Sequence, residues 1–348
     1  TQNLPEPTVV PSEHFNTVLY TGDGSTSRAI TGVGFQPDLA WVKSRSSASW
    51  WHVLTDSVRG GGFYLHSNNT NAEGGGGTSL ITGFNSDGFN VNLTPNGTVN
   101  NNLDTYVAWN WKANGTGVSN TSGSITSTVS ANADAGFSIV SYTGNGTANQ
   151  TVGHGLSKTP EIIIIKGREN AYYWSVINPR RVSTSNTNML YLNVTNAEAD
   201  DINIMGDNLP TATTFGVDDY GGVNVNNLGF IAYCFHSVDG YSKMGSYTGN
   251  GSADGTFVYT GFRPAYVMAK RTTGAQDWII FDGVRSPYNV SDDSLAANSS
   301  AAESTADSKV DFLSNGFKSR YGSSNFGGNN DPYIYLAFAE YPFKHTNA

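Results

Sequence analysis

The chain has a single cysteine, Cys234, among its 348 residues. One thiol cannot form a disulfide within the chain, and it cannot form a cysteine metal cluster. Cys234 stands in the apolar segment FIAYCF. We therefore expect it to be a buried and inert thiol. The fold must then be stabilised by apolar packing rather than by cross-links.

Charged residues are also scarce. They make up 14% of the chain, the net charge is −9, and there is no basic run. Proteins that bind nucleic acids need a basic patch, so we expect no nucleic-acid partner. The longest wholly aliphatic run, Ile162–Ile165, is far shorter than the roughly 20 residues of a membrane span, so we expect no membrane insertion. The start at Thr1, with neither Met nor a signal-peptide pattern, indicates a processed or partial product.

Catalytic motifs are missing as well. The sequence has no Gly-x-Ser-x-Gly, no His-Glu-x-x-His and no phosphate-binding glycine loop. Its six histidines do not recur at a constant spacing. We therefore predict no enzyme activity, no cofactor and no metal site. A polysaccharide depolymerase stays an alternative, because a glycosidase needs only two carboxylates at a suitable separation in space.

A short phrase is repeated three times. Residues 141–146 and 246–251 both read SYTGNG, and residues 19–24 read LYTGDG. Proline, lysine and tryptophan follow each phrase at matching distances. In particular, each lysine lies six residues after its proline and each tryptophan fourteen: Lys43, Lys166 and Lys270, and Trp51, Trp174 and Trp278. Offsets that stay constant over about a hundred residues indicate three tandem homologous modules.

The apolar runs are short, bounded by Gly, Asn, Asp and Pro, and without helical period. This pattern predicts an all-β fold of three tandem β-sandwich modules, each with at most a short helical turn. Proline-rich and Gly/Ser/Thr/Asn-rich stretches set the boundaries. We predict an extended arm over 1–14, module 1 over 15–113, a flexible linker over 114–135, module 2 over 136–238 and module 3 over 239–348.

Most of the repeated residues have a structural interpretation. Gly-Asn-Gly and Gly-Asp-Gly tolerate positive φ and predict a tight turn after a strand, with a sugar site as the alternative. Ser or Thr three residues before Glu73, Glu198 and Glu303 predicts a helix capping box in each module. The pattern Asp-x-x-Arg at Asp56 and Asp282 predicts an ion pair that holds a loop, although module 2 has Asn178 there.

One candidate binding site remains. If the tryptophans at offset fourteen point into the sandwiches, the residues before them point outward, because side chains alternate along a strand. These residues are Trp50, Tyr173 and Asp277. Exposed aromatic rings suit stacking against the C–H faces of sugars. Packing of both neighbours under a loop, and the opposite orientation with the tryptophans outside, stay open as alternatives.

The succession NTVLYTGDG, GVGFQPDLAWVKSRS, GFSIVSYTGNG and YIYLAFAEYPFK, with the phrases between them, resembles modules repeated in virion proteins of marine tailed phages. The resemblance covers nearly the whole chain beyond the arm. It implies a jelly-roll or concanavalin A-like sandwich in a fibre, spike or decoration protein. It places the protein on the virion surface, extracellular, in contact with other virion proteins or copies of itself.

The resemblance leads to an expected function. We predict a non-enzymatic tail-fibre or adhesin-like protein for host attachment, which binds host surface glycans through its repeated modules. Tandem weak sites would gain avidity. The first alternative is a purely structural subunit of a capsid, tail or extracellular filament, with no ligand and with the arm lying on a neighbouring subunit. The depolymerase is the second.

Overall fold

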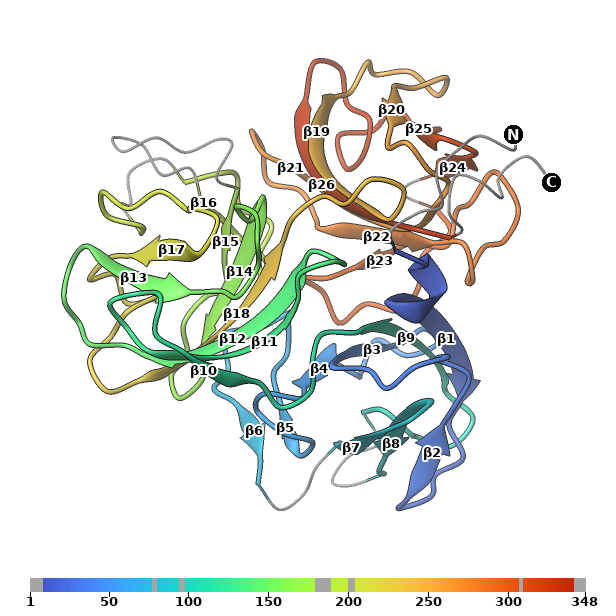
Figure 1. Ribbon diagram of the computed structural model, residues 1–348. Helices are drawn as coiled ribbons and strands as arrows, with labels where there is room; N and C mark the ends of the chain where they lie inside the picture. The colour runs from blue at the N-terminus through green and yellow to red at the C-terminus, as the bar shows by residue number, and fades with distance from the viewer. Residues whose placement is uncertain are drawn as a thin grey trace, which may run out of the picture.

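The computed structural model describes residues 9–76, 80–93, 98–178, 189–199, 204–306 and 309–340. Within these residues the protein is all-β, as predicted, apart from one 3-10 turn, η1 (Pro11–Glu13). The strands form three large antiparallel sheets with smaller sheets beside them. Figure 1 shows the three large sheets grouped around a common centre, in blue, green and orange to red.

The three large sheets share one strand order: the first strand of a module pairs with its last, the last with the second, and the second with the third. Module 1 orders β1 (Phe15–Thr21), β9 (Thr105–Trp111), β3 (Leu39–Ser44) and β4 (Val53–Asp56) in this way. Module 2 orders β12 (Phe137–Thr143), β18 (Gly229–Phe235), β14 (Ile162–Gly167), β15 (Ser175–Ile177) and then β16 (Met189–Tyr191). Module 3 orders β19 (Ser242–Thr248), β26 (Pro332–Ala339), β21 (Pro264–Arg271), β22 (Ile279–Asp282) and then β23 (Leu295–Ala296). Equal order in three segments is the topology expected of a repeat.

Each large sheet is buried on both faces. Along β14, Ile162 and Ile164 belong to a central core, whereas Ile163 and Ile165 belong to a core inside module 2. Because successive side chains point to opposite faces, a strand covered on both sides must be apolar throughout. This explains the continuous run IIII, which shows no alternation of polar and apolar residues.

The outer face of each large sheet is covered by a small sheet, with an apolar core between the two. These small sheets are β2 (Arg28–Ile30), β8 (Gly88–Val91) and β7 (Ile81–Asn85) in module 1, β13 (Gln150–Gly153) and β17 (Thr214–Val217) in module 2, and β20 (Phe257–Tyr259), β25 (Gly316–Ser319) and β24 (Val310–Leu313) in module 3. A further ribbon in module 1 pairs β5 (Phe63–Tyr64) with β6 (Gly74–Gly75).

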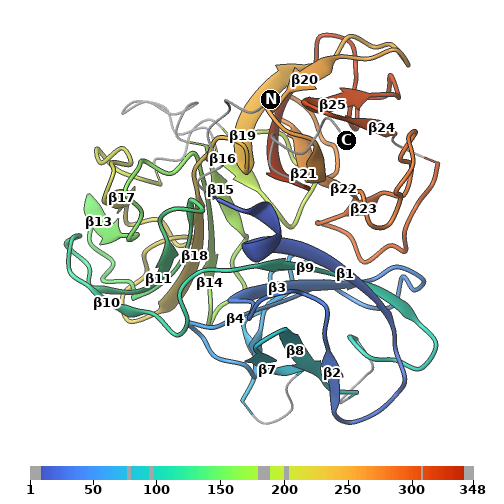
Figure 2. The same ribbon diagram turned by 45° about the vertical axis from the view of Figure 1, so that its right-hand side comes forward.

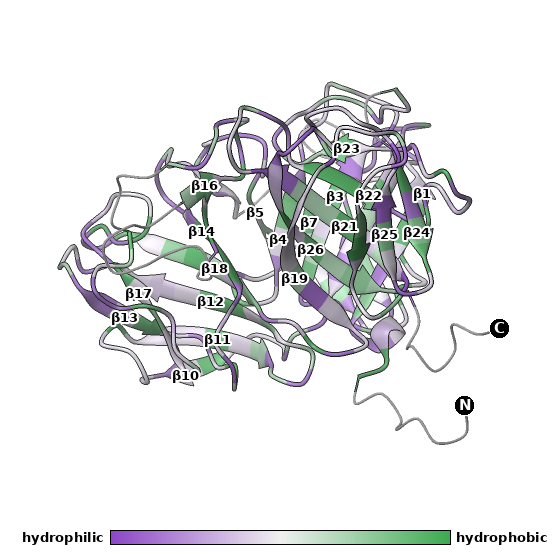
Figure 3. Cartoon of the chain, turned by 90° about the horizontal axis from the view of Figure 1, so that it is seen from above, coloured by the Kyte–Doolittle hydropathy of each residue, from purple (hydrophilic) through white to green (hydrophobic). Residues whose placement is uncertain are grey.

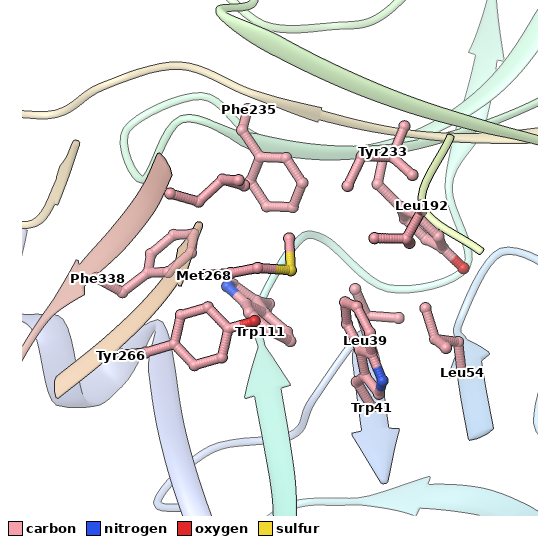
Figure 4. A pocket seen from close by; sticks show the side chains of 12 residues that line it. Leu39, Trp41, Leu54, Trp111, Leu192, Tyr233, Phe235, Tyr266, Met268 and Phe338 are labelled. Carbon is pink, nitrogen blue, oxygen red and sulfur yellow. The ribbon is translucent and has the colours of Figure 1, made fainter. Parts of the chain in front are cut away.

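The inner faces of the three large sheets meet in one central core (Figures 1 and 2). Figure 4 shows side chains from all three modules around a cavity at this centre, among them Trp41, Tyr233 and Met268. The cavity has a volume of about 20 Å³ and an apolar lining, which offers a water molecule no polar partners. Figure 3 shows hydrophobic segments concentrated on the strands and hydrophilic ones in the outer loops.

Two predicted connecting segments have a different structure. The predicted flexible linker, 114–135, contains β10 (Val118–Asn120) and β11 (Ser127–Asn132), and β11 pairs with β12 over six residues. Its Ser and Thr side chains alternate with Val and Ala, which suits an outer strand of a sheet. Residues 1–8 of the predicted arm lie outside the described residues. Its last part folds back onto the molecule, because Val9 is buried in the central core.

The repeated phrase forms a turn in all three modules, as predicted. Each phrase spans the end of a first strand, and its last glycine has positive φ: 69° at Gly24, 64° at Gly146 and 71° at Gly251. The residue between the glycines accepts a backbone hydrogen bond from two positions further on, at 2.9–3.0 Å. The phrase is therefore conserved between modules for shape.

Candidate functional site

The predicted capping boxes are wrong: the segments at 70–73, 195–198 and 300–303 contain no helical turn. Their glutamates join neighbouring modules instead. Glu73 accepts two hydrogen bonds from Arg168 of module 2, at 2.7 and 3.0 Å, and Glu303 accepts two from Arg45 of module 1, at 2.7 and 3.0 Å. The backbone N–H of Glu198 donates to the carbonyl of Thr272 in module 3 at 2.8 Å. The contacts run from module 1 to 2, from 2 to 3 and from 3 to 1, which closes a ring.

The two Asp-x-x-Arg pairs lie inside this ring. Asp56 and Arg59 are 2.6 Å apart with both side chains fully buried, and Asp282 and Arg285 are 2.5 Å apart in the same way. Asp56 also accepts the hydroxyl of Tyr233 from module 2, and Asp282 accepts the indole N–H of Trp109 from module 1. These pairs hold loops and modules together, as predicted. In module 2 the partner of Asn178 in the motif, Arg181, lies outside the described residues.

Neighbouring modules also meet at the residue before each third strand. Trp174 donates its indole N–H to the carbonyl of His66 in module 1, and Trp278 donates to the carbonyl of Tyr191 in module 2, both at 2.9 Å. In module 1 this place is taken by His52, 3.0 Å from the carbonyl of Ala296 in module 3. Trp51 is therefore not the counterpart of Trp174 and Trp278, although the spacing from proline predicts it.

An aromatic pocket opens beside this junction in module 1. It is a cavity of about 210 Å³ lined by Ser49, Trp50, Trp51, Tyr64, His66, Leu80 and Thr98. The rings of Trp51 and Tyr64 flank His66, with ring centroids 5.0 and 5.2 Å from it. At ~30 Å³ per molecule in the liquid, the volume equals about seven water molecules, which suits a single small ring.

The polar ring in this pocket is the imidazole of His66, and the hydrogen bonds of His52 and His66 show which ring nitrogens carry protons. His52 accepts from Trp41 at Nδ1 and donates to Ala296 at Nε2, so it is a neutral imidazole. His66 donates from Nδ1 to the carbonyl of His52 at 2.6 Å, which leaves Nε2 as a hydrogen-bond acceptor. Burial lowers the pKa of both imidazoles and keeps them neutral at neutral pH. The described lining of the pocket therefore carries no formal charge.

The three predicted site residues have different surroundings. Trp50 is half-buried in the pocket wall and donates its indole N–H to Asp104 at 2.6 Å. Tyr173 is exposed, and its ring centroid lies 4.8 Å from that of Tyr191. Asp277 is half-buried and accepts a hydrogen bond from Asn298 at 2.7 Å. Trp50 and Tyr173 thus lie in aromatic clusters of different modules, and Asp277 in neither.

Three aromatic residues of the pocket, Trp51, Tyr64 and His66, are not among the predicted site residues, although an outward orientation of Trp51 stays open as an alternative. Nine residues separate Lys43 from Val53, whereas eight separate Lys166 from Ser175 and Lys270 from Ile279. The extra residue shifts the third strand of module 1 by one position. A count backward from the third strand would have aligned Trp51 with Tyr173.

The described residues contain no group of three His, Cys, Asp or Glu side chains that could hold a metal ion. Cys234 is buried, as predicted, and burial raises the pKa of its thiol to about 12, so the reactive thiolate is disfavoured. No helix in the described part of the chain is long and apolar enough to cross a membrane.

Comparison with protein families gives one match. A family described as Domain of unknown function (DUF7483) matches residues 10–342, nearly the whole chain. Neither a curated protein nor a solved structure matches the sequence or the fold.

Proposed function

The chain belongs to the DUF7483 family, and from that premise we propose that it is a non-enzymatic sugar-binding protein of a phage virion surface. The virion location comes from the resemblance of its repeated phrases to modules of marine tailed-phage virion proteins. In this proposal the three modules are tandem jelly-roll or concanavalin-like sandwiches. The protein is extracellular, assembles with other virion proteins or copies of itself, and attaches to host surface glycans.

The observation that carries the proposal is the aromatic pocket of module 1. Aromatic faces are electron-rich and attract the C–H groups of a sugar ring, and Trp51 and Tyr64 supply such faces. Nε2 of His66 accepts a hydrogen bond, and Ser49 brings a hydroxyl group to the same wall. A few polar groups within an apolar lining are typical of a small-molecule site.

The size of the pocket sets the expected affinity. A single sugar has roughly a dozen non-hydrogen atoms, and about −0.3 kcal/mol per atom corresponds to about −4 kcal/mol. This value is equivalent to a Kd of about 1 mM. A single pocket of this kind therefore binds weakly, and attachment to a cell would depend on several sites acting together.

The proposal is tested by saturation-transfer NMR with neutral monosaccharides and with polysaccharide from host cell surfaces. Trp51→Ala should reduce saturation transfer to the monosaccharide by the part that arises at the pocket, and Tyr288→Ala should leave it unchanged, because Tyr288 is 83% exposed in module 3, outside the pocket. Trp51 is itself 42% exposed, so its loss should not unfold the protein. If no carbohydrate binds the wild-type protein, the sugar-binding function is refuted.

The purely structural alternative needs its own test. Deletion of residues 1–8 leaves the buried Val9 and the central core intact. If this deletion abolishes assembly of the particle while no glycan binds to the full chain, the protein is an architectural subunit. Release of oligosaccharides from the polysaccharide during the binding assay would instead establish a depolymerase. Retention of intact polysaccharide supports the non-enzymatic function.

A further inference from the structure

Module 2 has a second aromatic cluster at the position of the pocket in module 1. The second residue of each third strand pairs with a leucine further along the chain: Leu54 with Leu65, Val176 with Leu190 and Ile280 with Leu295. The residues that follow these three leucines are therefore equivalent: His66, Tyr191 and Ala296. By the same register, Trp51 in module 1 is equivalent to Tyr173 in module 2 and to Asp277 in module 3.

The equivalent pairs are aromatic in two modules only. The ring centroids of Trp51 and His66 lie 5.0 Å apart, and those of Tyr173 and Tyr191 lie 4.8 Å apart. The hydroxyl groups of Tyr191 and Tyr220 are 3.0 Å apart, which adds a third ring to the cluster of module 2. Tyr173 is 47% exposed, so part of this side chain is accessible to a ligand. In module 3, Asp277 and Ala296 offer no ring.

We propose that Tyr173, Tyr191 and Tyr220 form a second saccharide site, so that the chain binds a neutral polysaccharide at two points. This inference rests on the proposed function of the pocket in module 1. The tyrosine site is a platform: Tyr173 stacks on a sugar ring, and the paired hydroxyls of Tyr191 and Tyr220 bind its hydroxyl groups. The position in module 3 binds no sugar, which makes the valence two.

The two sites occupy equivalent positions in the ring of modules. The hydrogen bonds from Trp174 to His66, from Trp278 to Tyr191 and from His52 to Ala296 repeat one contact between successive modules. A contact that repeats and closes after three modules relates them by rotation about one axis. Rotation keeps equivalent positions at the same end of the axis. One extended polymer, or one cell surface, can therefore reach both aromatic sites at once.

The chemistry of the two sites favours an uncharged sugar. The described lining of the pocket in module 1 contains no lysine or arginine that would pair with a carboxylate or sulfate group, and the proposed contacts of the second site come from three uncharged tyrosines. The chain as a whole carries a net charge of −9, which repels anionic polymers. Neutral hexose polymers meet both conditions, because their C–H faces stack on rings and their hydroxyl groups accept and donate hydrogen bonds.

The test compares two ligands on four proteins: the wild type, Trp51→Ala, Tyr173→Ala and the double variant. On a surface coated with neutral polysaccharide, each single variant should bind about 10- to 100-fold more weakly than the wild type, because avidity is lost. The double variant should not bind. In saturation-transfer NMR with a monosaccharide, each single variant should still show binding at its unmutated site. Asp277→Asn, at the equivalent place in module 3, is the matched control and should bind as the wild type does.

The outcomes separate this inference from the function on which it rests. If Tyr173→Ala binds both ligands as the wild type does while Trp51→Ala binds neither, the second site is refuted and the pocket stands. If the wild type binds no carbohydrate, both proposals fail together. Tyr191→Phe removes only the paired hydroxyl and keeps the ring, so it should weaken binding at the second site without unfolding the module. Unchanged monosaccharide binding by Tyr191→Phe in the Trp51→Ala background would exclude the assigned role of the hydroxyl pair.

Discussion

Glu303 of module 3 and Arg45 of module 1 form a bidentate ion pair across 258 positions of sequence. Nε of Arg45 donates to Oε2 at 3.0 Å, and Nη2 donates to Oε1 at 2.7 Å. The same carboxylate accepts Nη1 of the buried Arg285 at 3.0 Å. Glu303 therefore joins the last module to the first and to its own loop, at the point where the ring of modules closes.

Glu303→Gln should lower the free energy of unfolding by about 3 kcal/mol, because it leaves Arg285 with less compensation for its buried charge. The measurement is denaturation in urea or guanidinium chloride. Glu340→Gln is the matched control: its carboxylate pairs with Arg263, and both side chains are about one third exposed, so its loss should cost less than about 1 kcal/mol. Equal losses in the two variants would contradict a special role for the closing pair.

Trp174→Phe should weaken sugar binding at the pocket of module 1, although Trp174 belongs to module 2. The change removes the indole N–H that binds the carbonyl of His66, and an unpaired buried carbonyl costs about 1–3 kcal/mol. Trp278→Phe removes the equivalent bond to Tyr191 and is the control. Both should lose similar stability, but in the Tyr173→Ala background, where only the pocket of module 1 binds, only Trp174→Phe should reduce saturation transfer to a monosaccharide. Equal binding by the two variants would show that the junction does not position His66.

Local features of this fold could be predicted from its sequence. The last glycine of each repeated phrase has the positive φ that its turn requires, and the threefold repetition of the phrase predicts equivalent strands. The run IIII indicated a strand, and the structure explains it by burial on both faces. These predictions succeed because turn conformation and strand burial depend on neighbouring residues.

Contacts between modules could not be predicted in this way. The same Thr-x-x-Glu spacing suits a capping box and a loop whose glutamate binds a distant arginine, and Glu73 adopts the second arrangement with Arg168. The alignment of Trp51 with Trp174 and Trp278 is wrong by one residue for a related reason. A loop longer by one residue moved the outward position from Trp50 to Trp51, because side chains alternate along a strand.

The stability of the protein should fall as the pH falls from about 6.5 to about 4, in part because of His154. This side chain accepts the backbone N–H of Leu156 at Nδ1 and donates to the carbonyl of Thr211 at Nε2, which requires a neutral imidazole. Burial lowers its pKa to about 4. The unfolded chain then binds the extra proton between pH 6.5 and 4, so the contribution is complete above pH 6.5 and is lost below it.

His154→Gln should remove this part of the pH dependence. The difference in unfolding free energy between pH 7 and pH 4 should become smaller than in the wild type by up to about 3 kcal/mol. Denaturant titrations at half-unit steps of pH provide the measurement. Identical pH profiles for the variant and the wild type would contradict the assignment to His154.

Three buried lysines should affect the alkaline part of the pH profile. They should raise the free energy of unfolding between pH 8 and pH 10. Lys166 donates to the carbonyls of Thr70 in module 1 and of Gly167, and Lys270 donates to the carbonyl of Thr195 in module 2. Burial lowers the pKa of Lys43, Lys166 and Lys270 to about 8. Above pH 8 the folded protein releases these protons before the unfolded chain does, so the free energy of unfolding rises with pH.

Lys166→Met tests this gain. The variant should be less stable than the wild type at pH 7, because the carbonyls lose their donor. Its stability should rise less between pH 8 and pH 10, by up to about 2 kcal/mol. Lys158→Met, at an exposed lysine of the same module, should keep the wild-type slope. The range must end near pH 10, because burial raises the pKa of Tyr142 in the folded protein and its ionisation then favours unfolding. A slope for Lys166→Met as steep as that of the wild type would mean that the proton is released elsewhere.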